Sequence, residues 1–113
     1  MMNTHGYAGY ILYVDLTSKT VRKEKLGEDL IRKYVGSLGI NTRLAYDLIK
    51  PGIDPLSPDN HLIFGIGPLG GTLAPACSRS NANSKSPLTG LFGSANSGDS
   101  VSLMLKYAGY DHL

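Results

Sequence analysis

The residues best suited to chemistry lie in residues 70–98, where glycine, serine, asparagine and one arginine replace regularly spaced apolar residues. Small residues let backbone N–H groups approach a ligand, and hydroxyl and amide side chains add further hydrogen-bonding groups. We interpret this stretch as a cradle for an anionic, hydrogen-bonding ligand. A plain surface loop rich in glycine and serine has the same composition and stays open as the alternative.

Arg79 and Asn96 have the most specific chemistry within the cradle. The guanidinium group of Arg79 presents a planar fork of donors that fits phosphate, although a structural ion pair or a plain surface arginine would also explain it. Asn96 belongs to residues 95–98, which we predict to form a tight turn just before a helix, a setting that favours anions. The alternative for Asn96 is an ordinary left-handed turn residue or helix cap.

Several strands are expected to position the cradle. Alternation of apolar residues, and short apolar runs, predict strands over residues 10–16, 21–26, 61–67, 80–84 and 90–94. The first two are separated by turn-forming residues, which predicts a hairpin. Residues 51–60 hold three of the six prolines and are expected to form a stiff, mostly extended loop.

Apolar residues at helical spacing predict three short helices, over residues 28–35, 40–50 and 99–108. Gly36 is placed to end the first helix, and residues 36–39 are interpreted as a turn between helices more readily than as a ligand contact. The third helix is apolar on nearly all sides, so we expect it to be buried, with Ser97 or Ser100 as its N-cap. After Gly109 the sequence predicts the start of another strand.

Composition bounds the class of protein. The 113 residues, of which 42% are hydrophobic and 18% charged, suit one globular domain over residues 1–113. A net charge of +2 and the absence of a long apolar run predict neither a nucleic-acid partner nor a membrane partner. The single cysteine, Cys77, makes no disulfide or clustered-cysteine metal site within one chain, and fits the reduced cytoplasm.

Seven short segments, in order along the chain, resemble the N-terminal domain of the aldehyde:ferredoxin oxidoreductases. They are residues 10–17, 36–39, 53–60, 67–69 with 71–72, 85–90, 95–98 and 105–111. The resemblance covers essentially the whole chain, and seven segments in register are far more specific than any one of them.

The resemblance implies a tungsten enzyme, or in a few members a molybdenum enzyme, in which two pterin dithiolenes hold the metal beside a [4Fe-4S] cluster. Members oxidise aldehydes to carboxylic acids and pass the electrons to ferredoxin, and a branch contains the tungsten subunit of benzoyl-coenzyme A reductase. The N-terminal domain of the family is an α+β fold of two intertwined, related halves that forms a flat base for the cofactor. Residues 1–113 would be a partial base domain of this kind.

The resemblance also implies roles for individual residues. Arg79 corresponds to an arginine that binds cofactor phosphate, and Asn96 to a residue whose backbone carbonyl helps hold a magnesium ion between the two pterin phosphates. Ala95, Ser97 and Gly98 are expected to shape the same turn. Lys85 is expected either to reach a phosphate or to face water.

The residues expected to bind the iron–sulfur cluster, and the acid and base groups near the metal, are not in this sequence. This chain would therefore bind and orient the cofactor, with the remaining catalytic domains as its partners. Residues 99–104 also depart from a stretch that is rich in glycine and aromatic residues in relatives, which leaves the shape of the site after Asn96 open.

Two alternatives remain. A short non-catalytic protein related to the base domain could pair with a second copy of itself as a homodimer, through an exposed strand edge. An unrelated phosphate- or nucleotide-binding module is disfavoured, because the chain lacks the phosphate-binding motif GxxxxGK[ST].

Overall fold

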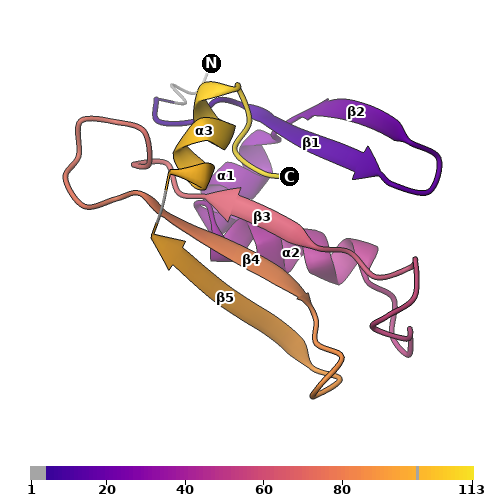
Figure 1. The fold of residues 1–113 in the computed structure, drawn as a ribbon. Helices are drawn as coiled ribbons and strands as arrows, with labels where there is room; N and C mark the ends of the chain where they lie inside the picture. Colours follow the sequence, from indigo (N-terminus) through magenta and orange to yellow (C-terminus); the bar gives the residue numbers. More distant parts are fainter. Residues whose placement is uncertain (1–4, 99) are drawn as a thin grey trace.

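The computed structural model describes residues 5–98 and 100–113, in which two strands, two helices, three strands and one helix follow one another along the chain (Figure 1). The elements are β1 (Tyr10–Asp15), β2 (Thr20–Lys25), α1 (Glu28–Tyr34), α2 (Leu38–Leu48), β3 (Ile63–Ile66), β4 (Arg79–Lys85), β5 (Phe92–Gly98) and α3 (Val101–Tyr107). The predicted α+β class, with three short helices, is confirmed.

The strands form two antiparallel units. β1 and β2 make the predicted hairpin, in which Val14 faces Val21. β3, β4 and β5 form a three-stranded meander in that order, with Asn81 of β4 between Gly65 of β3 and Asn96 of β5. Within the described residues, β2 and β5 are therefore the outer strands.

Residues 111–113 join the two units. Asp111 N–H donates to Tyr10 O at 2.9 Å, and Leu12 N–H donates to His112 O at 2.9 Å. On the other side, Leu113 and Phe64 exchange backbone hydrogen bonds of 2.9 and 2.7 Å. This short segment thus lies between β1 and β3, where His112 forms isolated bridges to Ile11 and Gly65, but the described residues after Gly109 do not form the predicted strand.

The helices pack on opposite faces of the meander, with α2 behind it and α3 in front in Figure 1. The core lies between α2 and the sheet, where the apolar faces of α1 and α2 pack against the strands. Its buried members are Ile11, Leu26, Ile31, Ile40, Leu44, Ala45 and Ile63. No helix of the described residues is long and apolar enough to cross a membrane.

α1 ends at Tyr34, close to the predicted stop at Gly36, but Gly36 itself does not have a positive φ. The residues with positive φ are Val35, at 63°, and Ser37, at 45°. Gly36 N–H donates to Tyr34 O at 2.7 Å, which closes a tight three-residue turn around Val35. Gly36 is instead needed for space, because a Cβ there would lie 3.0 Å from Pro68 Cδ.

The prediction that the third helix is buried is wrong for these residues. Val101, Met104 and Tyr107 are 68%, 62% and 67% exposed, and the only buried member of the described α3 is Ser102. The reason is that α3 packs on the sheet through one side, and no further layer of described residues covers the other. Ser100 occupies the N-cap position without a side-chain capping bond, and Asp99 lies outside the described residues.

The loop over residues 51–60 is ordered, but it is built from turns and is less extended than predicted. Asp54 Oδ1 accepts a hydrogen bond from Leu56 N–H, and Asn60 Nδ2 donates to Pro55 O and Lys85 O at 2.8 and 3.1 Å. These bonds fasten the loop to the end of β4.

Candidate functional site

Residues 95–98 do not form the predicted tight turn. They are the last four residues of β5, paired with β4 so that Asn96 faces Asn81 and Gly98 faces Arg79. Alanine, asparagine, serine and glycine have little preference for strands, and turn chemistry is the natural prediction from sequence. Here the pairing with β4 decides the conformation.

The Asn81 side chain holds Asn96 in this register. Its Nδ2 donates to Asn96 Oδ1 at 2.8 Å, and also reaches Ser94 Oγ at 3.0 Å and Ala95 O at 3.2 Å. Asn81 is only 2% exposed, so these bonds are protected from water. A buried amide thus replaces the apolar cross-strand contacts that β5 lacks.

The backbone of Asn96 faces the open edge of β5. Phe64 points its backbone N–H and C=O toward residues 111–113. Successive residues of a strand point these groups to opposite sides, so the N–H and C=O of Gly65 point toward Asn81 of β4. The backbone N–H and C=O of Asn81 therefore pair with β3 and not with β5. Because Asn96 lies opposite Asn81, its own N–H and C=O point away from β4. Within the described sheet, this carbonyl lies on an outer edge where a ligand can reach it.

Arg79 begins β4 beside this edge and is exposed. Among the described residues, no carboxylate forms an ion pair with its guanidinium group, so the alternative of a structural ion pair finds no support there. The loop that leads into Arg79 is fastened by Ser102 Oγ, which donates to Ser78 O at 2.8 Å.

Cys77 is partly buried, and its Sγ donates to Ala74 O at 2.7 Å. Within residues 5–98 and 100–113, no group of three or more histidine, cysteine, aspartate or glutamate side chains is arranged to hold a metal ion.

Lys85 is not brought together with Arg79, because the two residues begin and end β4. At a rise of about 3.3 Å per residue, they lie roughly 20 Å apart along the strand. Lys85 Nζ donates to Ile53 O at 2.6 Å, in the proline-rich loop. Sequence reasoning considered phosphate and water as its partners, and missed this backbone carbonyl.

Sequence reasoning also missed a cluster of buried polar groups under the sheet. Asn41 of α2 and His112 are both 0% exposed, and His112 Nδ1 lies 2.7 Å from Asn41 Oδ1. Asn41 Nδ2 donates to Asn81 O at 3.0 Å and to Asn83 Oδ1 at 2.9 Å. An asparagine on the apolar face of a predicted helix was the available signal.

Burial lowers the pKa of His112 to about 4, with the nearby Lys106 charge acting in the same direction and Asp111 against it. His112 is therefore neutral at neutral pH.

A buried ion pair lies beside this cluster. Lys106 Nζ is 3.2 Å from Asp111 Oδ1 and also donates to Gly67 O at 3.0 Å. The two oxygens of Asp111 accept from the backbone N–H groups of Ala8 and Gly9, at 3.0 and 2.6 Å. These bonds connect α3, the loop after β3 and the residues before β1.

Residues 65–70 read GIGPLG and match the spacing G-x-G-x-x-G, which our sequence analysis overlooked. A dinucleotide site needs this motif between a strand and the N-terminus of a helix within a parallel βαβ unit. Here β3 leads through a loop to the antiparallel β4, so no helix N-terminus is present to bind a pyrophosphate.

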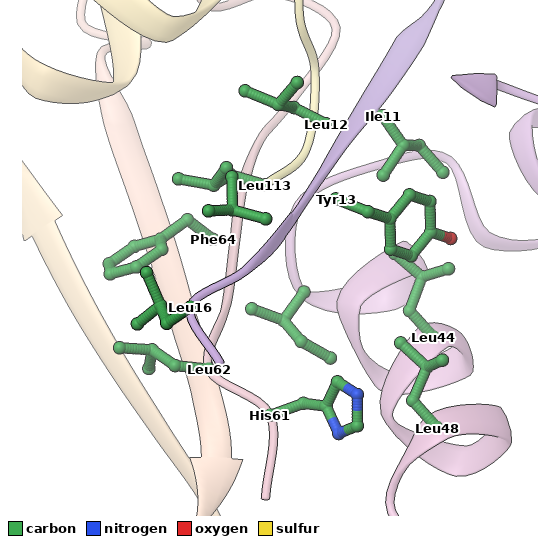
Figure 2. A pocket seen from close by; sticks show the side chains of 12 residues that line it. Ile11, Leu12, Tyr13, Leu16, Leu44, Leu48, His61, Leu62, Phe64 and Leu113 are labelled. Carbon is green, nitrogen blue, oxygen red and sulfur yellow. The ribbon is translucent and has the colours of Figure 1, made fainter. Parts of the chain in front are cut away.

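An apolar cavity of about 280 Å³ lies between β1, β3 and α2 (Figure 2). It lies away from Arg79 and Asn96, and Leu113 reaches its mouth.

Comparison with known proteins places these features in context. The family model described as "Aldehyde ferredoxin oxidoreductase, N-terminal domain" matches residues 11–113. Tungsten-containing aldehyde ferredoxin oxidoreductases of Pyrococcus abyssi and Pyrococcus furiosus are each 43% identical to the chain, over 94% and 95% of its length. A WOR-like subunit of an aliphatic sulfonate oxidoreductase of Pyrococcus furiosus is 34% identical over 95% of the chain.

A solved structure, the active-site complex BamBC of benzoyl coenzyme A reductase with 1,5-dienoyl-CoA, contains a similar fold. It matches 96% of this chain with a TM-score of 0.93 and 37% identity. The chain spans only 18% of the length of the first two relatives, and 16% of the chain in the solved structure.

Proposed function

The chain belongs to the aldehyde ferredoxin oxidoreductase family, and we propose that residues 1–113 form a single, partial base domain that binds a tungsten–pterin cofactor. Two neighbouring groups support this proposal. Arg79 is an exposed guanidinium group without an ion-pair partner among the described residues, and Asn96 presents its carbonyl on the adjacent open edge.

The chemistry of these groups fits a phosphorylated cofactor. A guanidinium group binds two phosphate oxygens through parallel, charge-assisted hydrogen bonds. A backbone carbonyl is a suitable ligand for magnesium, which requires oxygen ligands and often bridges phosphates. Ala95, Ser97 and Gly98 flank the carbonyl with small side chains, and leave room for a bulky ligand.

The metal–pterin group supplies the redox chemistry when it is bound, and these residues anchor and orient it. In this proposal Arg79 binds cofactor phosphate, and Asn81 holds Asn96 so that its carbonyl stays on the edge. Lys85 has no part in this proposal, because it lies at the far end of β4 and its Nζ donates to Ile53 O.

The rest of the proposed enzyme lies outside these residues. We propose that further domains carry a [4Fe-4S] cluster and the catalytic groups, and that the whole enzyme oxidises aldehydes to carboxylic acids in the cytoplasm with ferredoxin as acceptor. The relatives are named as tungsten-containing aldehyde ferredoxin oxidoreductases, which supports this choice of metal and substrate class.

A second candidate is a non-catalytic domain that pairs with its own copy. The observation in its favour is the outer edge of β5, where six of seven residues are exposed. Sedimentation of the 113-residue chain tests it: a dimer that survives dilution supports this candidate, and a monomer at high concentration rules it out.

The substitution Arg79→Ala in the full-length native polypeptide tests the cofactor proposal. Loss of two charge-assisted bonds, each worth about 1.5–3 kcal/mol, should lower bound tungsten and pterin at least tenfold. Arg22→Ala is the matched control, because Arg22 is an exposed strand arginine in the distant hairpin. Equal tungsten and pterin contents in the two variants would contradict the proposal.

A further inference from the structure

β5 lacks the feature that normally fixes the register of a strand. Six of its seven residues are exposed, and two of the seven are glycines. A strand with one buried apolar face resists slipping, because a slip by one residue moves that face to solvent, whereas polar or glycine-rich strands slip easily. The register of β5 therefore depends on something other than apolar burial.

The loop before β5 fixes only the beginning of the strand. Ser86 N–H donates to Leu91 O at 2.8 Å, and Gly90 N–H donates to Ser86 O at 2.8 Å, which closes the turn. Asn96 lies further along the strand. A bulge of one extra residue at Gly93 would leave the turn intact and would point the Asn96 carbonyl toward β4.

Two buried asparagines of β4 bind the part of β5 beyond the turn. Asn81 and Asn83 are 2% and 1% exposed. Asn83 Nδ2 donates to Gly93 O at 3.2 Å, and Asn81 Nδ2 donates to Ala95 O at 3.2 Å. The side-chain amides thus add to the backbone ladder at the point where β5 has no apolar contacts of its own.

The side-chain bonds of Asn81 are specific for the observed register. Its Nδ2 lies 3.0 Å from Ser94 Oγ and 2.8 Å from Asn96 Oδ1. Side chains alternate between the faces of a strand, so a slip by one residue would move Ser94 and Asn96 to the opposite face. Asn81 would then lose both side-chain acceptors.

The orientation of the Asn83 amide is set from α2. Asn41 Oδ1 accepts from His112 Nδ1, at 2.7 Å, so its Nδ2 remains to donate to Asn83 Oδ1 at 2.9 Å. With its oxygen held by Asn41, Asn83 directs its own Nδ2 to Gly93 O. A directed chain of hydrogen bonds therefore runs from His112 through α2 to β5.

Stability alone does not account for an amide at position 81. Asn81 Oδ1 is buried without a hydrogen-bond partner among the described residues. A buried acceptor left unpaired is unfavourable, and an apolar side chain of similar size would avoid this cost. The donor side of the amide, which binds β5, is the part that the arrangement uses.

We propose that Asn81 and Asn83, oriented by Asn41, are positioning residues that select the register of β5 and so keep the Asn96 carbonyl on the outer edge of the sheet. In the slipped register this carbonyl would pair with β4, and a cation could not reach it. The purpose of the arrangement rests on the proposed role of Asn96 as a magnesium ligand. The register itself is measurable without cofactor.

Hydrogen exchange of the 113-residue chain, followed amide by amide, tests the register. In the unchanged chain the N–H of Ala95 points to β4 and that of Asn96 points to the outer edge, so Ala95 should be protected about tenfold or more over Asn96. Asn81→Leu keeps the volume and removes the amide, and should abolish this difference. Phe64 N–H, which donates to Leu113 O, should keep its protection.

Asn60→Leu is the matched control. Asn60 is also a partly buried asparagine that binds β4, through Lys85 O at 3.1 Å, but among the described residues its side chain bonds to none in β5. This variant should lower the stability of the chain and leave the difference between Ala95 and Asn96 unchanged. If Asn81→Leu does not fold, Asn81→Ser gives the comparison, because serine keeps only one donor.

A second readout concerns magnesium in the full-length native polypeptide. Bound pterin is measured at a series of free Mg²⁺ concentrations. Asn81→Leu should raise the Mg²⁺ concentration needed for half retention by about tenfold or more, because the carbonyl is no longer held on the edge. A loss of stability without a change in register, as in Asn60→Leu, should leave this concentration unchanged.

Three results would overturn the inference. One is equal protection of Ala95 and Asn96 in the unchanged chain. Another is a full difference between them in the combined variant Asn81→Leu with Asn83→Leu. The third is an unchanged Mg²⁺ requirement in Asn81→Leu while Arg79→Ala lowers bound pterin, which would remove the positioning role and leave the cofactor proposal standing. Unchanged pterin in both variants would overturn the two proposals together.

Discussion

Asn41 and His112 are 71 residues apart in the sequence, and they are joined by a 2.7 Å hydrogen bond under the sheet. Because Asn41 Oδ1 carries no proton, His112 Nδ1 is the donor of this bond. The same asparagine donates through Nδ2 to β4. One buried amide therefore links α2, the meander and the segment between the two strand units.

We expect Asn41→Ala to lower the free energy of unfolding by about 3 kcal/mol, because each buried polar group left without a partner costs about 1–3 kcal/mol. Urea denaturation measures the change. The neighbouring Thr42→Ala is the control, since Thr42 is exposed and bonds only within its helix. Similar losses in the two variants would show that the buried amide contributes little.

Two glycines of one segment should differ in their tolerance of alanine. A Cβ at Gly65 would clash with both Asn41 Oδ1 and His112 Nδ1, whereas a Cβ at Gly67 would meet nothing within 4 Å. We expect Gly65→Ala to destabilise the chain by about 1–3 kcal/mol, the usual cost of overpacking, and Gly67→Ala to have a small effect. Thermal unfolding of both variants checks this, and equal midpoints would contradict it.

The stability should fall in mild acid because of His112. Burial lowers its pKa from 6.5 to about 4, so the unfolded chain binds a proton more readily between these values. The contribution of neutral His112 to the free energy of unfolding is fully present above pH 6.5. About 3 kcal/mol of this free energy is lost as the pH falls toward 4. Urea midpoints at pH 7 and pH 5 measure the slope, which should be smaller in His112→Gln. An identical slope in that variant would exclude His112 as its source.

The Lys106–Asp111 pair should show the behaviour of a buried ion pair. The two side chains are 9% and 1% exposed, so Lys106→Met leaves a buried carboxylate without its cation and should cost about 3–5 kcal/mol. Adding Asp111→Asn should recover part of this loss, because the neutral amide oxygen still accepts from one of the N–H groups of Ala8 and Gly9. A double variant less stable than Lys106→Met alone would contradict this account.

The exposed Arg43–Asp47 pair provides the comparison for that experiment. Its side chains are 38% and 47% exposed, and such pairs contribute about 0.2–1 kcal/mol. Arg43→Ala should therefore change the unfolding free energy much less than Lys106→Met.

Local patterns in the sequence were sufficient for the hairpin, for α1 and α2 to within about two residues, and for β3 and β4. In these elements apolar residues recur at the period of the structure that buries them, so pattern and conformation agree. The ordered motifs were also sufficient for the family, which the match over residues 11–113 confirms.

Tertiary structure alone decided the features that depend on distant partners. Residues 95–98 became strand and not turn because Asn81 of β4 binds Asn96 across the ladder. The polar core, the carbonyl to which Lys85 bonds and the apolar cavity beside Leu113 likewise join segments far apart in the chain. Sequence patterns record which face of an element is buried, but not which distant residue satisfies a polar group there, because that partner is chosen only when the elements pack.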